Sequence, residues 1–158
     1  MNKIIDSDTP INEYLSFKIS VLYRLMVRRS ARYLNSSYDL SVAEWWTLGQ
    51  LASRSPITVS EIVDATQNDK AQVSRSATSL IAKGFVEKQD NPHDKRSSLL
   101  SLTEAGRELY EEVIPIRQKT QNLLLDQLSE EEREVTERAI KKMTKYLLDH
   151  PELVVAAE

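Results

Sequence analysis

Helix-start signals recur along this chain and divide it into segments. Three have the form S/T-x-x-E and begin at Ser41, Thr58 and Ser129. In such a capping box, the hydroxyl and the carboxylate each accept a hydrogen bond from a backbone N–H that the helix leaves unpaired. Asp69-x-x-Gln72 is a looser form of the same signal, with an acid as the cap. A chain marked in this way is predicted to be mainly helical.

Apolar spacing between these starts predicts a series of helices. The expected ranges are 11–35, 42–53, 59–66, 70–83, 104–128 and 130–148. Thr9 is expected to cap the first helix, with Pro10 at the first helical position, where a missing N–H costs nothing. On the fourth helix, the apolar side chains expected to face the core are Val73, Ala77, Leu80 and Ile81.

After Gly84 the apolar period changes from that of a helix to that of a strand. Gly84 itself is expected to end the fourth helix in a left-handed conformation. The runs 85–88 and 98–102 are typical of short strands, and the segment between them carries Lys95 and Arg96 at its tip. A short helix, a turn, a second helix and a hairpin follow the order of a winged helix-turn-helix. The predicted fold class is therefore mainly α with a small β-hairpin wing.

Local charge favours a nucleic-acid surface although the whole chain is acidic. The formal net charge is −3, yet residues 70–96 carry six cations and three acids, a balance of +3, which leaves −6 for the rest. Exposed charges are screened beyond about 10 Å at ordinary ionic strength, so the local balance decides whether a polyanion docks. A basic segment on an acidic body is compatible with a DNA contact.

In helix-turn-helix proteins, the second helix presents its N-terminal residues to the major groove. Here that face is predicted to consist of Lys70, Gln72, Ser74 and Arg75. Arginine can bond two acceptors of guanine, and glutamine can bond adenine in the same way. The plainer interpretations are that Arg75 pairs with a neighbouring acid and that the other three only keep the helix soluble.

The hairpin tip is predicted to reach the minor groove, which is narrow and strongly negative in A·T-rich DNA. Arg96 is the candidate for insertion, with Lys95 beside it. Asp94, two residues earlier, is expected to bond the Arg96 guanidinium and hold its rotamer. The alternative is a solvated cation at a loop tip.

Three stretches carry a resemblance to a known family. "DKRSSLLSLTEAG" (94–106) is close to the D-x-R-S wing signature of the MarR (multiple antibiotic resistance regulator) family. "VSRSATSLIAKGFVEK" (73–88) and "LSVAEWWTLGQLA" (40–52) resemble its recognition helix and its second helix. The resemblance implies a homodimer on a palindromic DNA operator, with Arg96 in the minor groove, Asp94 orienting it and Arg75 on the recognition helix. It also implies release from DNA by a small anionic, often aromatic ligand.

The resemblance and the helix pattern together predict one domain over residues 1–158. The apolar stripes of the long terminal helices exceed what one small core needs, so these helices are expected to dimerise. The expected parts are dimerisation helices at 11–36 and 104–148, a DNA-binding lobe at 37–103, a helix-turn-helix at about 59–83 and a wing at about 85–102.

Candidate ligand residues are Arg28, Arg32 and Trp46. The two arginines can bind an anion such as an aromatic acid or an aryl thioester, and Trp46 can stack on a ring. Trp45 is expected to pack in the core instead. Cations along a long helix are ordinarily a solvated face, which is the competing interpretation of Arg28 and Arg32.

Other function classes lack their residues. The chain has no cysteine, two histidines and three glycines, so no metal site, phosphate loop or cofactor is predicted and an enzyme is not expected. No apolar run approaches the roughly 20 residues of a membrane span, which predicts a cytoplasmic protein. Two alternatives to a ligand-released repressor stay open: a winged helix used for protein contact, and an activator without a small-molecule effector.

Overall fold

The structure is a computed structural model that describes residues 8–152 of the 158, so both ends of the predicted domain lie outside the described residues. The helices are η1 (Ile11–Glu13, 3-10), α1 (Leu15–Tyr38), α2 (Val42–Arg54), α3 (Val59–Thr66), α4 (Lys70–Ala82), α5 (Glu104–Leu125) and α6 (Glu130–Asp149). The strands are β1 (Ile57–Thr58), β2 (Val86–Asp90) and β3 (Ser98–Leu102). The chain forms two compact units, one up to Tyr110 and one from Glu111 onward, which are described separately.

The predicted helix starts are confirmed where side chains cap them. The capping boxes at Ser41, Thr58 and Ser129 are each complete, with both reciprocal hydrogen bonds formed. Asp69 caps α4 by accepting a hydrogen bond of 3.0 Å from the backbone N–H of Gln72. Each such cap stabilises its helix by roughly 1 kcal/mol, so these starts are fixed by local chemistry.

The first long helix differs from the prediction at both ends. Pro10 has an extended backbone (ψ 142°) and precedes η1, so Thr9 does not cap a helix with Pro10 at its first position. The α-helix begins only at Leu15. It ends at Tyr38, beyond the expected boundary, because Asp39 adopts a left-handed conformation (φ 51°) and closes the helix where glycine is more common.

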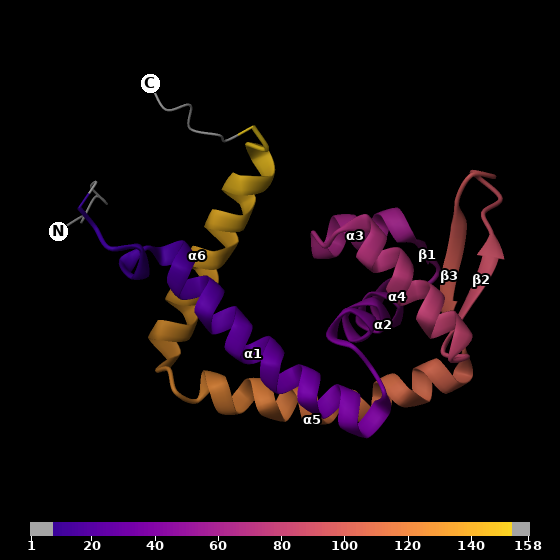
Figure 1. Cartoon of the computed structure of the whole chain (residues 1–158), viewed down its shortest axis with the longest axis horizontal. Coiled ribbons are helices and arrows are strands. Elements are labelled where there is room, and N and C mark those ends of the chain that lie inside the picture. Colours follow the sequence, from indigo (N-terminus) through magenta and orange to yellow (C-terminus); the bar gives the residue numbers. More distant parts are fainter. Residues whose placement is uncertain (1–7, 153–158) are drawn as a thin grey trace. The chain divides into compact units, whose positions relative to one another are not determined.

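The wing is a three-stranded sheet, not the two-stranded hairpin expected from the sequence. The strand order is β1-β3-β2 and both pairings are antiparallel (Figure 1). In the hairpin, Val86 lies opposite Leu102 and Asp90 opposite Ser98. The short strand β1 pairs Ile57 with Leu100. It ties the base of the wing to the segment between α2 and α3.

The core of the first unit is built from α2, α3, α4 and the sheet, together with Leu34 near the end of α1 and Leu40 just after it. Its buried apolar side chains are Leu34, Leu40, Trp45, Leu48, Leu51, Ile57, Ile62, Val73, Ala77, Leu80, Val86, Leu100 and Leu102. Trp45 is 5% exposed, as predicted, and stacks on Tyr110 with ring centroids 5.3 Å apart. The expected core position of Ile81 is wrong: this side chain is 36% exposed. Ser76 is buried instead, because residues 73, 76, 77 and 80 form one helical stripe and residue 81 lies about 40° past Ala77, outside the edge of that stripe.

Two hydrogen bonds join Thr103, the residue after β3, to the residues that follow α4. Gly84 has φ 79°, as predicted for a left-handed helix end. The Thr103 hydroxyl donates to the Gly84 carbonyl at 2.7 Å, and the Thr103 N–H donates to the Phe85 carbonyl at 3.1 Å. The Gly106 N–H in turn donates to the Thr103 hydroxyl at 3.1 Å, which caps α5. The strands therefore leave α4 in a fixed direction.

Candidate nucleic-acid interface

Helices α3 and α4 form the predicted helix-turn-helix. Gln67 ends α3 in a left-handed conformation (φ 54°), and its N–H donates to the Val63 carbonyl at 2.7 Å. One further residue, Asn68, separates it from Asp69, the cap of α4. The turn lies where the sequence places it. Its tightness comes from an unusual conformation at a residue that is not glycine.

The side of α4 opposite its buried stripe is the predicted reading face. Lys70, Gln72, Ser74 and Arg75 are all exposed. Among the described residues, neither Lys70 nor Arg75 takes part in an ion pair. The alternative in which Arg75 braces the helix against an acid therefore receives no support. These four side chains are available to an outside partner.

The wing tip is a structured turn. Asn91 donates from its amide to the Ser97 hydroxyl at 2.8 Å and accepts from the His93 N–H at 3.0 Å. Lys95 and Arg96 are exposed at this tip. The expected bond from Asp94 to the Arg96 guanidinium is not formed. The carboxylate instead accepts a hydrogen bond of 2.9 Å from the Arg96 backbone N–H.

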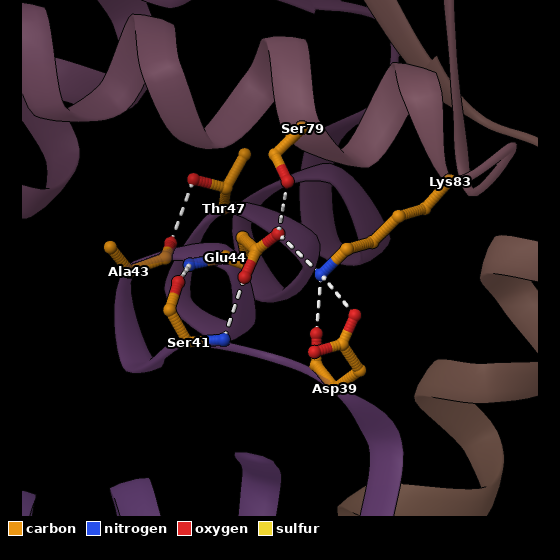
Figure 2. Close-up of polar contacts among 7 residues, drawn as sticks. All are labelled: Asp39, Ser41, Ala43, Glu44, Thr47, Ser79 and Lys83. Atoms are coloured by element: carbon orange, nitrogen blue, oxygen red, sulfur yellow. Dashed lines mark hydrogen bonds and ion pairs between the residues drawn. The ribbon is translucent and has the colours of Figure 1, made fainter.

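A buried carboxylate joins α4 to the corner between α1 and α2, and sequence reasoning missed this role. Glu44 has a side chain only 7% exposed. One carboxylate oxygen accepts from the Ser41 N–H at 2.6 Å, and the other accepts from the Ser79 hydroxyl at 2.7 Å and the Lys83 ammonium at 2.9 Å (Figure 2). The ammonium also lies 3.4 Å from the Asp39 carboxylate and donates to the Asp39 carbonyl.

These contacts set the charge states of the cluster. Burial raises the pKa of Glu44, but hydrogen bonds from the Ser41 backbone, Ser79 and Lys83 outweigh it and lower the pKa to about 2. Burial lowers the pKa of Lys83, and its contacts with Glu44 and Asp39 more than reverse this effect, so that pKa is raised. Both groups are therefore charged at neutral pH, and each stabilises the charge of the other.

A cavity of about 900 Å³ lies between the C-terminal half of α1, the start of α2 and α4. Arg32 lines it, as do two residues of the reading face, Gln72 and Arg75. The other two candidate ligand residues, Arg28 and Trp46, are exposed and do not line this cavity. The structure thus brings one predicted ligand residue together with two predicted DNA-binding residues. No described helix has the length and hydropathy needed to cross a membrane.

Comparison with known proteins gives consistent results. The MarR family model matches residues 38–97, which span the helix-turn-helix and the wing up to its tip. The transcriptional regulator HosA of Escherichia coli O111:H- is 25% identical over 122 residues, covering 77% of this chain and 90% of HosA.

Solved structures extend the likeness over most of the chain. A MarR/EmrR family regulator from Acinetobacter sp. ADP1 is 27% identical with a TM-score of 0.82, covering 89% of this chain and 99% of that one. The S. aureus MepR–DNA complex is 26% identical with a TM-score of 0.78, covering 85% of this chain and 98% of MepR. The family-model match at residues 38–97 and these structural neighbours support a MarR-family DNA-binding transcriptional regulator; that family is not enzymatic.

Proposed function

We propose that this chain is a homodimeric repressor that binds a palindromic operator and is released by a small anionic, aromatic ligand. The observation that carries the proposal is the two-sided character of α4. Val73, Ala77 and Leu80 are buried, while the polar residues of the reading face are exposed. A winged helix used only for protein contact would not need that polar face beside a basic wing.

Exposed apolar side chains on the long helices support a dimer. On α1, Ile19, Leu22 and Leu25 are 46%, 51% and 52% exposed. In the second unit, Leu123, Ile140 and Leu147 are 60%, 53% and 64% exposed. Apolar side chains exposed in this way along a helix are typical of an interface between protein chains. A twofold dimer requires inverted half-sites, with recognition helices about 34–36 Å apart.

Each reading-face residue has a role that fits its chemistry. Arg75 would bond a guanine edge and Gln72 an adenine edge, both from the first turns of α4. Lys70 and Ser74 would contact phosphates and set the register. Arg96, with Lys95 beside it, would enter the minor groove from the wing tip.

The cavity beside α4 supports an effector site. Arg32 and Arg75 line it and can bind a planar carboxylate, while Val42 and Ala43, both partly exposed, add apolar surface. A ligand held there would occupy Arg75, a predicted DNA contact. To release DNA, the ligand must bind the DNA-free protein more tightly than the DNA-bound protein. A tenfold shift of that equilibrium requires a difference of about 1.4 kcal/mol in the free energy of ligand binding.

Selection from a randomised duplex pool tests the proposal. The expected product is an inverted repeat with half-site centres about 10 base pairs apart, bound by a dimer in sedimentation analysis. Salicylate and benzoyl-coenzyme A titrated into the complex should release the DNA. Without ligand, the protein should lower transcription from a promoter that overlaps the site. Enrichment of a single half-site bound by a monomer would contradict the dimer. An increase in transcription would instead favour the activator alternative.

A further inference from the structure

The recognition helix α4 is fastened to the α1–α2 corner by the Glu44 cluster. The apolar stripe of α4 also packs against the core, but apolar contacts are non-directional and tolerate rotation and sliding. Hydrogen bonds are directional and weaken steeply when misaligned. The contacts from Ser79 and Lys83 to Glu44 therefore add a directional constraint on the rotation of α4 about its own axis.

The cluster is saturated, which argues for an internal role. One Glu44 oxygen completes the cap of α2 and the other serves α4 (Figure 2). Each N–H of the Lys83 ammonium has an oxygen to meet. These oxygens belong to the Glu44 carboxylate, the Asp39 carboxylate and the Asp39 carbonyl. Lys83 is only 25% exposed in this arrangement. A DNA phosphate could recruit Lys83 only by breaking these contacts and leaving the buried Glu44 carboxylate without its counter-charge.

The geometry connects this cluster to base reading. Ser79 lies one helical turn after Arg75, so the two project from neighbouring positions of the same rigid helix. Functional side chains must be held within roughly 0.5 Å and 10–20° of their working geometry. A small rotation of α4 permitted by loss of the Ser79 contact would move Arg75 out of that range. Phosphate contacts tolerate such a shift far better, because charge–charge attraction is less directional.

We propose that Ser79 and Lys83 are positioning residues for sequence reading: through Glu44, they hold α4 at the rotation at which its exposed face meets base edges. The corner that they grip, Asp39 to Glu44, begins where α1 ends. The same contacts therefore connect α1, the proposed dimerisation helix, to the reading face. This inference rests on the proposed function.

The test separates specific from non-specific affinity. Ser79→Ala and Lys83→Met are compared with wild type on the selected duplex and on a shuffled duplex of equal length, over a range of potassium chloride concentrations. The expected result is a 5- to 50-fold fall in the ratio of the two affinities, with little change on the shuffled duplex. Lys141→Met is the matched control, since it removes the same charge from an exposed ion pair in α6 and should leave the ratio unchanged. Lys83→Arg should recover part of the ratio.

Thermal unfolding of each variant identifies a merely structural role. A lowered melting temperature with an unchanged affinity ratio in both variants would overturn the inference and leave the proposed function intact. The slope of log affinity against log salt concentration gives the number of phosphate contacts. A slope that falls by about one contact in Lys83→Met would also overturn the inference, because Lys83 would then touch DNA directly. If Lys83→Met does not fold, Ser79→Ala decides alone, since it removes one hydroxyl and no charge. A wild-type protein that distinguishes no duplex would overturn the proposed function itself.

Discussion

The carboxylate of Asp94 holds the backbone N–H of Arg96 at 2.9 Å and does not pair with the Arg96 guanidinium. This hydrogen bond shapes the turn at the wing tip and positions the backbone of Arg96, from which the side chain projects. The guanidinium makes no ion pair among the described residues. The wing therefore presents an arginine whose backbone N–H is bound within the turn and whose exposed guanidinium can meet an outside partner.

Arg96→Ala is expected to lower operator affinity by about 10- to 100-fold while leaving the oligomeric state unchanged. Hydrogen bonds to charged groups contribute about 1.5–3 kcal/mol, and each 1.4 kcal/mol is roughly tenfold in affinity. Gel-shift titration with sedimentation measures both quantities. Lys141→Ala is the charge-matched control in α6. An equal loss in the two variants would attribute the effect to overall charge and not to the wing.

Asp94→Asn should bind DNA nearly as well as wild type, whereas Asp94→Ala should bind more weakly. Asparagine keeps an oxygen that can accept the Arg96 N–H, and alanine does not. If Asp94 acted instead by pairing with the guanidinium, both variants would lose affinity together. The comparison of the two Kd values therefore distinguishes a turn-forming Asp94 from a side-chain clamp.

Gly106→Ala is expected to destabilise the first unit by about 3 kcal/mol, because overpacking typically costs that much when backbone must move. A Cβ at Gly106 would lie 2.0 Å from the Phe85 carbonyl oxygen, the same oxygen that accepts the Thr103 N–H. Chemical denaturation measures the loss. Gly49→Ala is the control, since its nearest contact is the Tyr110 ring at 3.9 Å and it should cost far less.

The elements that the sequence predicts well are those fixed by neighbours in the chain. The capping boxes and Asp69 place the starts of α2, α3, α4 and α6 because each cap and its partner are three residues apart. Strand β1 was missed because it has two residues and exists only through pairing with Leu100, far along the chain. The end of α1 was misplaced because Asp39, not a glycine, takes the left-handed conformation.

The candidate site divides in the same way. Helical periodicity predicts that the reading face of α4 is exposed, and its residues are exposed. The capping box explains only one oxygen of Glu44. Nothing in local spacing signals that Ser79 and Lys83 bind the other oxygen across the fold. The sequence predicts the Arg96 guanidinium as the partner of Asp94, but the partner is the Arg96 backbone N–H. Nearly every residue has a backbone N–H, so the sequence cannot indicate which one a carboxylate will bind.

Stability should fall on acidification through Glu44. Its pKa in the folded state, about 2, lies below the ordinary value of 4.5, so its contribution is full above the ordinary value and is lost as pH falls toward 2. Glu44→Gln cannot titrate. The difference in unfolding free energy between wild type and Glu44→Gln should begin to shrink below about pH 5 and continue to shrink toward pH 2. Glu134→Gln, at an exposed position, is the control. A constant difference for Glu44→Gln would mean that the cluster does not stabilise the charged carboxylate.

Leu22→Asp is expected to convert the protein from dimer to monomer at micromolar concentration. Leu22 is 51% exposed in the first unit, and a buried carboxylate without a partner would cost an interface several kcal/mol. Arg24→Asp introduces the same group two positions on, about 200° around the helix, and should leave the dimer intact. Sedimentation velocity distinguishes the two variants.

DNA binding then tests what the dimer contributes. A monomer loses the gain from binding both half-sites at once, so Leu22→Asp should bind the full inverted repeat little better than one half-site. Wild type should prefer the full repeat by about 100-fold or more. A variant that stays dimeric would place the interface elsewhere than this face of α1. A monomeric variant that keeps full preference would mean that the two half-sites are read independently, and the exposed stripe of α1 would then need another partner to explain it.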